Sequence, residues 1–176
     1  LMRGEIDEAA RAYEELLAEV PGYVEAANNL AYCRLRQGEL GEARELFSQA
    51  VTINPRLVAS IHVLGMLEAA LGRLDEAMAR LSEAVRLAPA NGSWALDLDG
   101  ARALARGEDS PASSRFRVRL GAYHREAAVA LEARGRTEAA RSHMIEAERI
   151  ESGADRAPLA GAPGHPDTTD AGGVSP

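Results

Sequence analysis

The fold of this chain is decided by residues 24–55, which are VEAANNLAYCRLRQGELGEARELFSQAVTINP. Apolar side chains at helical spacing form one stripe before Gly38 and a second stripe after it. The stretch therefore predicts two amphipathic helices that fold back on each other at Gly38. Because neither stripe can be buried by one helix alone, we expect neighbouring helix pairs to cover them.

The stretch recurs along the chain with a fixed period. Pro21, Pro55 and Pro89 follow one another at equal intervals. The same interval relates two further sets, Gly4, Gly38 and Gly72, and Ala9, Ala43 and Ala77. This interval matches the period of about 34 residues that is typical of one class of helix–turn–helix repeat arrays.

On these residues the sequence resembles the tetratricopeptide repeat family, whose motif is W-x₂-L-G-x₂-Y…A-x₃-F…P. The motif appears as Leu30-Ala31 with Ala43-x₃-Phe47 and Pro55, and as Leu64-Gly65 with Ala77-x₃-Leu81 and Pro89. The resemblance covers residues 1–92 and returns more weakly over residues 121–154. It implies an all-α fold, a right-handed α-solenoid of helix–turn–helix repeats.

The pattern predicts helices over about residues 5–19, 23–37, 40–53, 57–71 and 74–88. Residues 1–3 are interpreted as the last turn of an otherwise missing helix, because Gly4 occupies the turn position. We expect a partial repeat at 1–21, full repeats at 22–55 and 56–89, and a divergent repeat with capping helices at 90–151.

After Pro89 this period breaks down. A stripe that begins at Trp94 predicts one helix ending before Gly107, and Ser110 and Pro111 are suited to cap and begin a longer helix. Residues 115–120, RFRVRL, alternate as a strand would, but we favour a helix because the stripe continues to Tyr123 and no partner strand exists.

A last helix is expected after Gly135. Its stripe is Ala140, Met144, Ala147 and Ile150. Residues 152–176 are rich in Pro, Gly, Ala and Thr, and they cannot bury enough apolar surface to offset chain entropy. We predict that this tail is disordered and dispensable for folding.

The amino-terminal edge is expected to need a cover. The helix after Gly4 carries an apolar stripe of Ile6, Ala9, Tyr13 and Leu16, and its own partner helix is missing. Repeat arrays require a polar outer face on their terminal helices. We therefore expect that the native chain extends upstream, or that a partner or a second copy covers this edge.

The composition excludes several classes of function. The net charge of −7 disfavours non-specific nucleic-acid binding. All 20 basic residues are Arg, which excludes a Walker A loop and a Schiff-base lysine and indicates the coding bias of a GC-rich bacterium.

Cys33 is the sole cysteine and is expected to be a buried spacer. No apolar run is long enough to predict a membrane span, and the compartment, cytoplasmic or periplasmic, stays open.

No catalytic or metal-binding arrangement stands out in the sequence. The histidines are His62, His124, His143 and His165, and none of them are paired at i, i+4. His124 and His143 are not expected to converge. Arg115 and Arg119 share one side of a helix and Arg117 points elsewhere, which favours a solvated basic face over a phosphate site. We predict a chain that is not an enzyme and uses no cofactor or metal.

The resemblance implies that the first helix of each pair lines a concave binding groove. In the family the first, fourth, fifth and eighth positions after the opening residue of that helix project into the groove. In this sequence they are Glu25, Asn28, Asn29 and Tyr32, then Ala59, His62, Val63 and Met66, and then Ser93, Leu96 and Asp97. Asn29 matches the Asn that family members use to bond a peptide backbone, although it also simply fits the repeat. The cationic clamp for acidic chaperone tails is missing, because Ala59 and Val63 occupy its positions.

The predicted function is a non-catalytic scaffold or adaptor that binds a peptide or a partner helix. Its groove residues would be Asn28, Asn29, Tyr32, His62, Val63, Met66 and Leu96. The alternative is an accessory oligomerisation or docking segment of a larger enzyme or of an envelope or secretion assembly protein. The expected partner is a protein or peptide and not a nucleic acid, with self-association through the amino-terminal edge as a second option.

Overall fold

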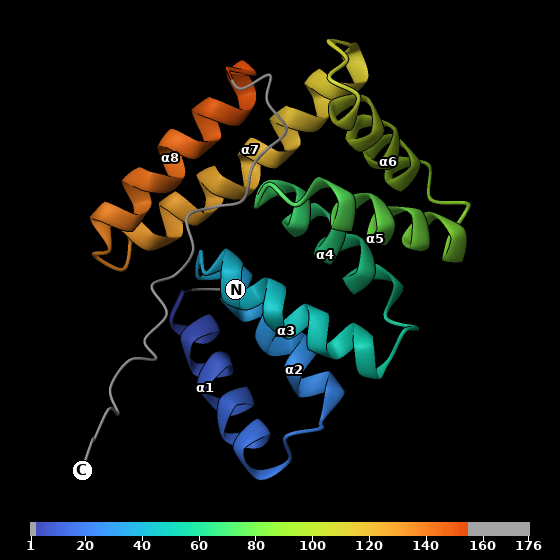
Figure 1. Ribbon diagram of the computed structural model, residues 1–176. Coiled ribbons are helices and arrows are strands. Elements are labelled where there is room, and N and C mark those ends of the chain that lie inside the picture. The colour runs from blue at the N-terminus through green and yellow to red at the C-terminus, as the bar shows by residue number, and fades with distance from the viewer. Residues whose placement is uncertain (1–2, 155–176) are drawn as a thin grey trace, which may run out of the picture.

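Eight α-helices and no β-strand make up residues 3–154, the part of the chain that this computed structural model describes (Figure 1). The helices are α1 (Arg3–Glu19), α2 (Val24–Arg36), α3 (Leu40–Ile53), α4 (Val58–Ala70), α5 (Leu74–Leu87), α6 (Gly92–Ala105), α7 (Pro111–Glu132) and α8 (Thr137–Ser152). The all-α helical repeat solenoid predicted from the sequence is confirmed. The predicted disordered tail lies outside the described residues, apart from residues 152–154.

Helices α2 and α3, and helices α4 and α5, form the two antiparallel pairs that the sequence predicts. Each pair turns at a glycine with positive φ, 85° at Gly38 and 81° at Gly72, a conformation that other residues rarely adopt. At Gly38 a second constraint applies, because an added Cβ would lie 2.6 Å from the carbonyl oxygen of Ala127 in α7. The turn is therefore also a contact point for a distant helix.

Helix α1 begins earlier than predicted. It starts at Arg3 and runs through Gly4, so the predicted turn at Gly4 is wrong. A Cβ added at Gly4 would have no neighbour within 4 Å, so no other element packs against the chain at this point. The predicted edge stripe is also largely covered: Ile6 is buried, and Ala9, Tyr13 and Leu16 are half-buried.

The segment that follows α5 departs from the repeat as the sequence indicates. Ser110 caps α7 by accepting a hydrogen bond from the Ser113 backbone N–H at 3.2 Å, and Pro111 is the first helical residue. Residues 115–120 are helical, which confirms the choice of helix over strand. The chain turns again at Gly135, φ 73°, and α8 returns antiparallel to α7.

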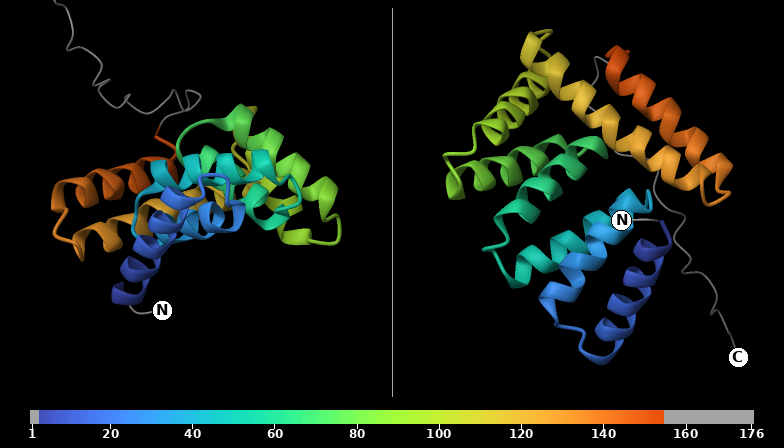
Figure 2. Two further views of the ribbon diagram at one scale, coloured as in Figure 1. Left: turned by 90° about the horizontal axis from the view of Figure 1, so that it is seen from below. Right: turned by 180° about the vertical axis from the view of Figure 1, so that it is seen from behind.

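Helix α7 crosses back over the repeat pairs instead of extending the stack (Figure 2). It begins against α6, where an added Cβ at Gly100 would lie 2.5 Å from the Cβ of Phe116. It continues past the end of α4 to the Gly38 turn. Arg134, just beyond α7, then forms an ion pair of 2.7 Å with Asp7 in α1. The last helices thus reach back to the first.

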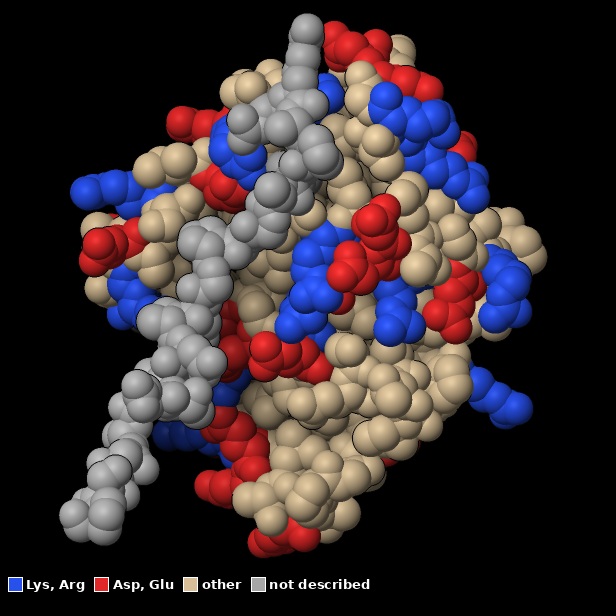
Figure 3. All heavy atoms as spheres, viewed as in Figure 1, with Lys and Arg blue, Asp and Glu red and all other residues tan. Residues whose placement is uncertain are grey.

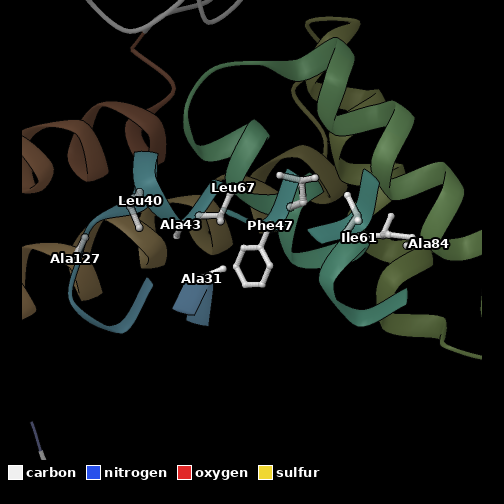
Figure 4. Close-up of a cluster of buried hydrophobic side chains, with 10 residues drawn as sticks. Ala31, Leu40, Ala43, Phe47, Ile61, Leu67, Ala84 and Ala127 are labelled. Atoms are coloured by element: carbon white, nitrogen blue, oxygen red, sulfur yellow. The ribbon is translucent and has the colours of Figure 1, made fainter. Parts of the chain in front are cut away.

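Two clusters of buried apolar side chains hold the helices together. The first surrounds Phe47 of α3 and includes Ala127 of α7 (Figure 4). The second contains Met66 and Leu81 from the repeats together with Phe116 and Leu120 from α7. Helix α7 therefore contributes to both cores.

Candidate functional site

The first-helix face is the name used here for the shared face of α2, α4 and α6, where the sequence predicts the groove. Its predicted residues are Glu25, Asn28, Asn29 and Tyr32 on α2, Ala59, His62, Val63 and Met66 on α4, and Ser93, Leu96 and Asp97 on α6. Residues near the helix starts are exposed, whereas those further along are half-buried or buried. The face is therefore divided into an open half and a covered half.

The covered half lies beneath α7. Met66 is fully buried in the second cluster, so it supplies packing and presents no surface to a ligand. Tyr32 is half-buried, with its ring edge-on to Phe47 at a centroid distance of 4.8 Å. Tyr123 of α7 packs against both clusters, and burial raises the pKa of its phenol to about 12. The groove was expected to include Tyr32 and Met66, but α7 crosses the stack at this point and packs over this part of the face.

A buried carboxylate lies between the two halves. Asp97 of α6 accepts a hydrogen bond from His62 Nε2 at 2.9 Å, and it forms an ion pair with Arg119 Nη1, also at 2.9 Å. The His62 ring stacks on Trp94, with centroids 4.7 Å apart and planes within 10°. A buried carboxylate is stable only when its charge is paired and its oxygens are bonded. His62 and Arg119 therefore tie α4 and α7 to α6, and Arg119 is not part of a purely solvated face.

The open half carries side chains of different chemistry. Asn29 is exposed, Val63 is half-buried, and Leu96 is 57% exposed. Asn28 is half-buried, and its Oδ1 accepts a hydrogen bond from Ser60 Oγ at 2.6 Å. This bond orients the amide and leaves its NH₂ group available to donate a hydrogen bond to a ligand. The open half can thus bond a peptide backbone through amides and contact apolar side chains.

The structure brings together His124 and His143, which the sequence analysis expected to stay apart. Their Nδ1 atoms are 2.8 Å apart, and His124 Nε2 lies 2.9 Å from the carbonyl oxygen of Ala70. Since a carbonyl only accepts, His124 donates through Nε2, and its Nδ1 accepts from His143. Burial lowers the pKa of both rings, that of His143 to about 4 with a further contribution from His124.

A signal for this pair exists in the sequence. His124 precedes Gly135 and His143 follows it, at comparable distances along the chain. A turn at Gly135 between antiparallel helices brings such positions to the same level of the helix pair. The i, i+4 rule for single helices does not detect this arrangement.

Other features of the described residues define what the site can do. Among residues 3–154 no three His, Cys, Asp or Glu side chains gather closely enough to hold a metal ion. None of the described helices combines the length and the apolar character that a membrane crossing requires. Cys33 is half-buried rather than buried, and burial raises the pKa of its thiol despite the nearby Arg34.

Hollows also lie outside the first-helix face. One, of about 570 Å³, lies between α7 and α8, another, of about 500 Å³, lies on α3 between Arg44 and Ile53, and a smaller one, of about 190 Å³, lies where α7 meets α1 and the end of α2. Figure 3 shows Arg, Asp and Glu side chains interspersed over α3 and α5, and a largely uncharged area over the lower parts of α1 to α3. Val20, just after α1, Tyr23, just before α2, and Ile53, the last residue of α3, are exposed.

Comparisons with known proteins agree with this fold. Family models described as tetratricopeptide repeat match residues 2–57 and 58–91. A crystal structure of MamA superposes with a TM-score of 0.56 at 20% identity, covering 86% of this chain and 91% of that chain. A second crystal structure of MamA superposes with a TM-score of 0.56 at 20% identity, and the match covers 91% of this chain and 90% of that chain. A structure of MamA AMB-1 superposes with a TM-score of 0.52 at 24% identity, and the match covers 85% of this chain and 92% of that chain. At these identities the likeness concerns the fold. No curated protein matches the sequence.

Proposed function

We propose, from the premise that this chain belongs to the tetratricopeptide repeat family, that it is an adaptor holding a peptide or a partner helix against the open half of its first-helix face. Members of this fold serve as protein–protein interaction scaffolds and are typically non-catalytic. The finer assignment to the open half rests on which side chains α7 leaves uncovered.

The observation that carries this proposal is the exposure of Leu96. Leu96 is a large aliphatic side chain that is 57% exposed on a helix of the predicted binding face, so a ligand that covers it is stabilised by removing this apolar surface from water. Complete burial of a Leu side chain contributes about 1.5–3 kcal/mol. Val63 adds a smaller apolar contact, and the Asn29 amide can form hydrogen bonds with a peptide backbone, each of which contributes about 0.5–1.5 kcal/mol.

The dimensions of the open half limit the ligand. Three helices set at the roughly 8–10 Å spacing of packed helices would span about 20 Å. An extended peptide rises about 3.3 Å per residue, so roughly six residues would cross the face. Because α7 covers the other half, we expect a short segment to bind and a long groove-filling helix to be excluded.

Site-specific photo-crosslinking tests the proposal. A photoreactive amino acid placed singly at positions 29, 63 and 96 should capture the same partner protein in the source organism, identified by mass spectrometry. Gln49, exposed on the outer side of α3, is the matched control position and should not capture it. Capture at position 49 with the same efficiency, or at none of the three positions, would contradict the assignment.

The alternative function is docking or oligomerisation within a larger enzyme or an envelope or secretion assembly protein. The apolar hollow between α7 and α8 favours it. A photoreactive residue at Val129, which lines that hollow, separates the two functions. Capture from position 129 without capture from positions 29, 63 and 96 would support docking through α7 and α8.

A further inference from the structure

The outer side of the α7–α8 hairpin exposes large apolar side chains. Val129 is 70% exposed, Ile145 is 59% exposed and Met144 is 40% exposed. Met144, which was expected in the apolar stripe of the last helix, lies at the surface instead. Helix α8 packs against α7 and leaves its other side without a helix from residues 3–154. Apolar side chains concentrated on one helix pair mark a surface that binds another protein.

This surface contains both a projection and a hollow. Val129 and Met144 stand at the edge of the 570 Å³ hollow, and buried Ala128 and Ala140 form part of its lining. Alanines leave room between the two helices, and the neighbouring valine and methionine supply side chains of suitable size to fill such room. A surface that carries both features can pack against its own copy.

Two charges on the rim of the hollow lack partners within the described part of the chain. Glu132 of α7 and Arg141 of α8 both line the hollow, and neither forms an ion pair within residues 3–154. Other long side chains near this turn are paired: Arg134 with Asp7, and Arg136 with Glu39. A partner with one negative and one positive group in the matching places would satisfy both.

A second copy supplies both groups. A two-fold axis that lies along the hollow, parallel to the helices, places α7 of one copy over α8 of the other at equal distances from the turn. Val129 and Ala140 lie at nearly equal distances along the chain from Gly135, so they would face each other across the axis. Arg141 lies somewhat further from the turn than Glu132, by about 4.5 Å along a helix, which an arginine side chain spans.

We propose that the α7–α8 hairpin forms a two-fold symmetric interface with a second copy of this chain, in which Val129 enters the partner copy's hollow and Glu132 pairs with the partner copy's Arg141. The interface lies on a different surface from the first-helix face. It is also distinct from the amino-terminal edge, whose stripe is already buried or half-buried.

The size of the surface predicts a weak dimer. Helix α8 is about 24 Å long, and two adjacent helices are about 20 Å wide, which gives roughly 500 Å² per copy. Stable interfaces bury about 800 Å² per partner, and smaller ones are transient. The chain should therefore exchange between monomer and dimer at micromolar concentrations.

Sedimentation velocity on the full chain from about 1 to 200 µM tests this interface, over the range expected for a small interface. The sedimentation coefficient should rise with concentration in the parent chain. Val129→Glu should move the midpoint of this rise at least tenfold higher. Val118→Glu is the matched control, because Val118 is 54% exposed on the same helix but does not line the hollow.

Charge reversal tests the pairing and the symmetry together. Glu132→Arg and Arg141→Glu should each weaken the dimer, and the double variant should restore it. Circular dichroism of each variant verifies that the helices are intact. A parent chain that is monomeric over the whole concentration range, equal effects of the substitutions at 118 and 129, or a double variant no better than the singles would overturn the proposal.

Discussion

The His124–His143 pair shows how individual residues couple three helices. His124 of α7 donates to the Ala70 carbonyl at the end of α4 and accepts from His143 of α8. His124 is neutral in this arrangement, because a proton on its Nδ1 would remove the acceptor of the bridge. Glu146 opposes the fall in the pKa of both rings, whereas Arg149 lowers that of His124 and Arg136 lowers that of His143.

The pair predicts that stability declines in mild acid. The folded-state pKa of His143, about 4, is below the value of 6.5 expected for the unfolded chain, so the unfolded chain binds the proton more readily. The contribution is complete above pH 6.5 and is lost as the pH falls towards 4. Urea unfolding of the parent chain and of His143→Asn at pH 7, 6 and 5 measures this. The variant should lose less stability across the range; parallel curves would show that His143 is not responsible.

At the scale of the element, the Gly38 turn joins a local requirement to a distant contact. Its positive φ ends the α2 helix, and its missing side chain admits the Ala127 carbonyl and the Leu131 side chain of α7. Gly41, in the first turn of α3, is exposed with no neighbour within 4 Å of an added Cβ. The two glycines therefore differ in both backbone strain and available space.

Alanine substitution should separate these two glycines. Gly38→Ala should destabilise the chain by about 1–3 kcal/mol or more, from the cost of positive φ together with the displacement of α7. Gly41→Ala should be neutral or stabilising by up to about 1 kcal/mol, because alanine favours the helix. Thermal and urea unfolding of both variants provide the comparison. Equal effects at the two positions would mean that α7 does not press on the turn.

At the scale of the whole molecule, α7 makes the chain more cooperative than a simple repeat array. Repeats in an open solenoid contact only their neighbours, so each adds a separate increment of stability. Here α7 contributes Ala127 to the first buried cluster and Phe116 to the second. The Arg134–Asp7 ion pair then joins the turn between α7 and α8 to the first helix.

Removing α7 and α8 should therefore damage repeats that they do not belong to. A chain that ends at Gly107 would expose parts of both clusters, and it should lose its single sharp unfolding transition and bind a hydrophobic dye. Removing only residues 155–176 is the control and should leave the transition unchanged. Differential scanning calorimetry measures both. A shortened chain that keeps the melting temperature of the parent within a few degrees would show that the repeats are independent.

The sequence predicted the repeat helices well and the path of α7 poorly. The boundaries of α3 followed from Gly38 and Pro55, because turn and stop signals are local. The stripe of α7 could not reveal which helices it packs against, since Phe116, Leu120 and Tyr123 would fit many apolar surfaces. Met66 was assigned to the groove because of its position on the helix, but it is buried in the second cluster, to which α7 contributes. Binding by Asn29 and Leu96 stays a prediction.

The late position of α7 in the chain has a consequence during translation. The side chains of the first cluster on α2 and α3 are all synthesised by Ile53, but Leu131 at the end of α7 follows only after three further helices and most of a fourth. At about 5–20 residues per second, the ribosome takes roughly 4–16 s to add that stretch. During that interval the apolar side of the Gly38 turn has no α7 to cover it, so the nascent chain presents a binding surface for cellular chaperones that the finished protein conceals.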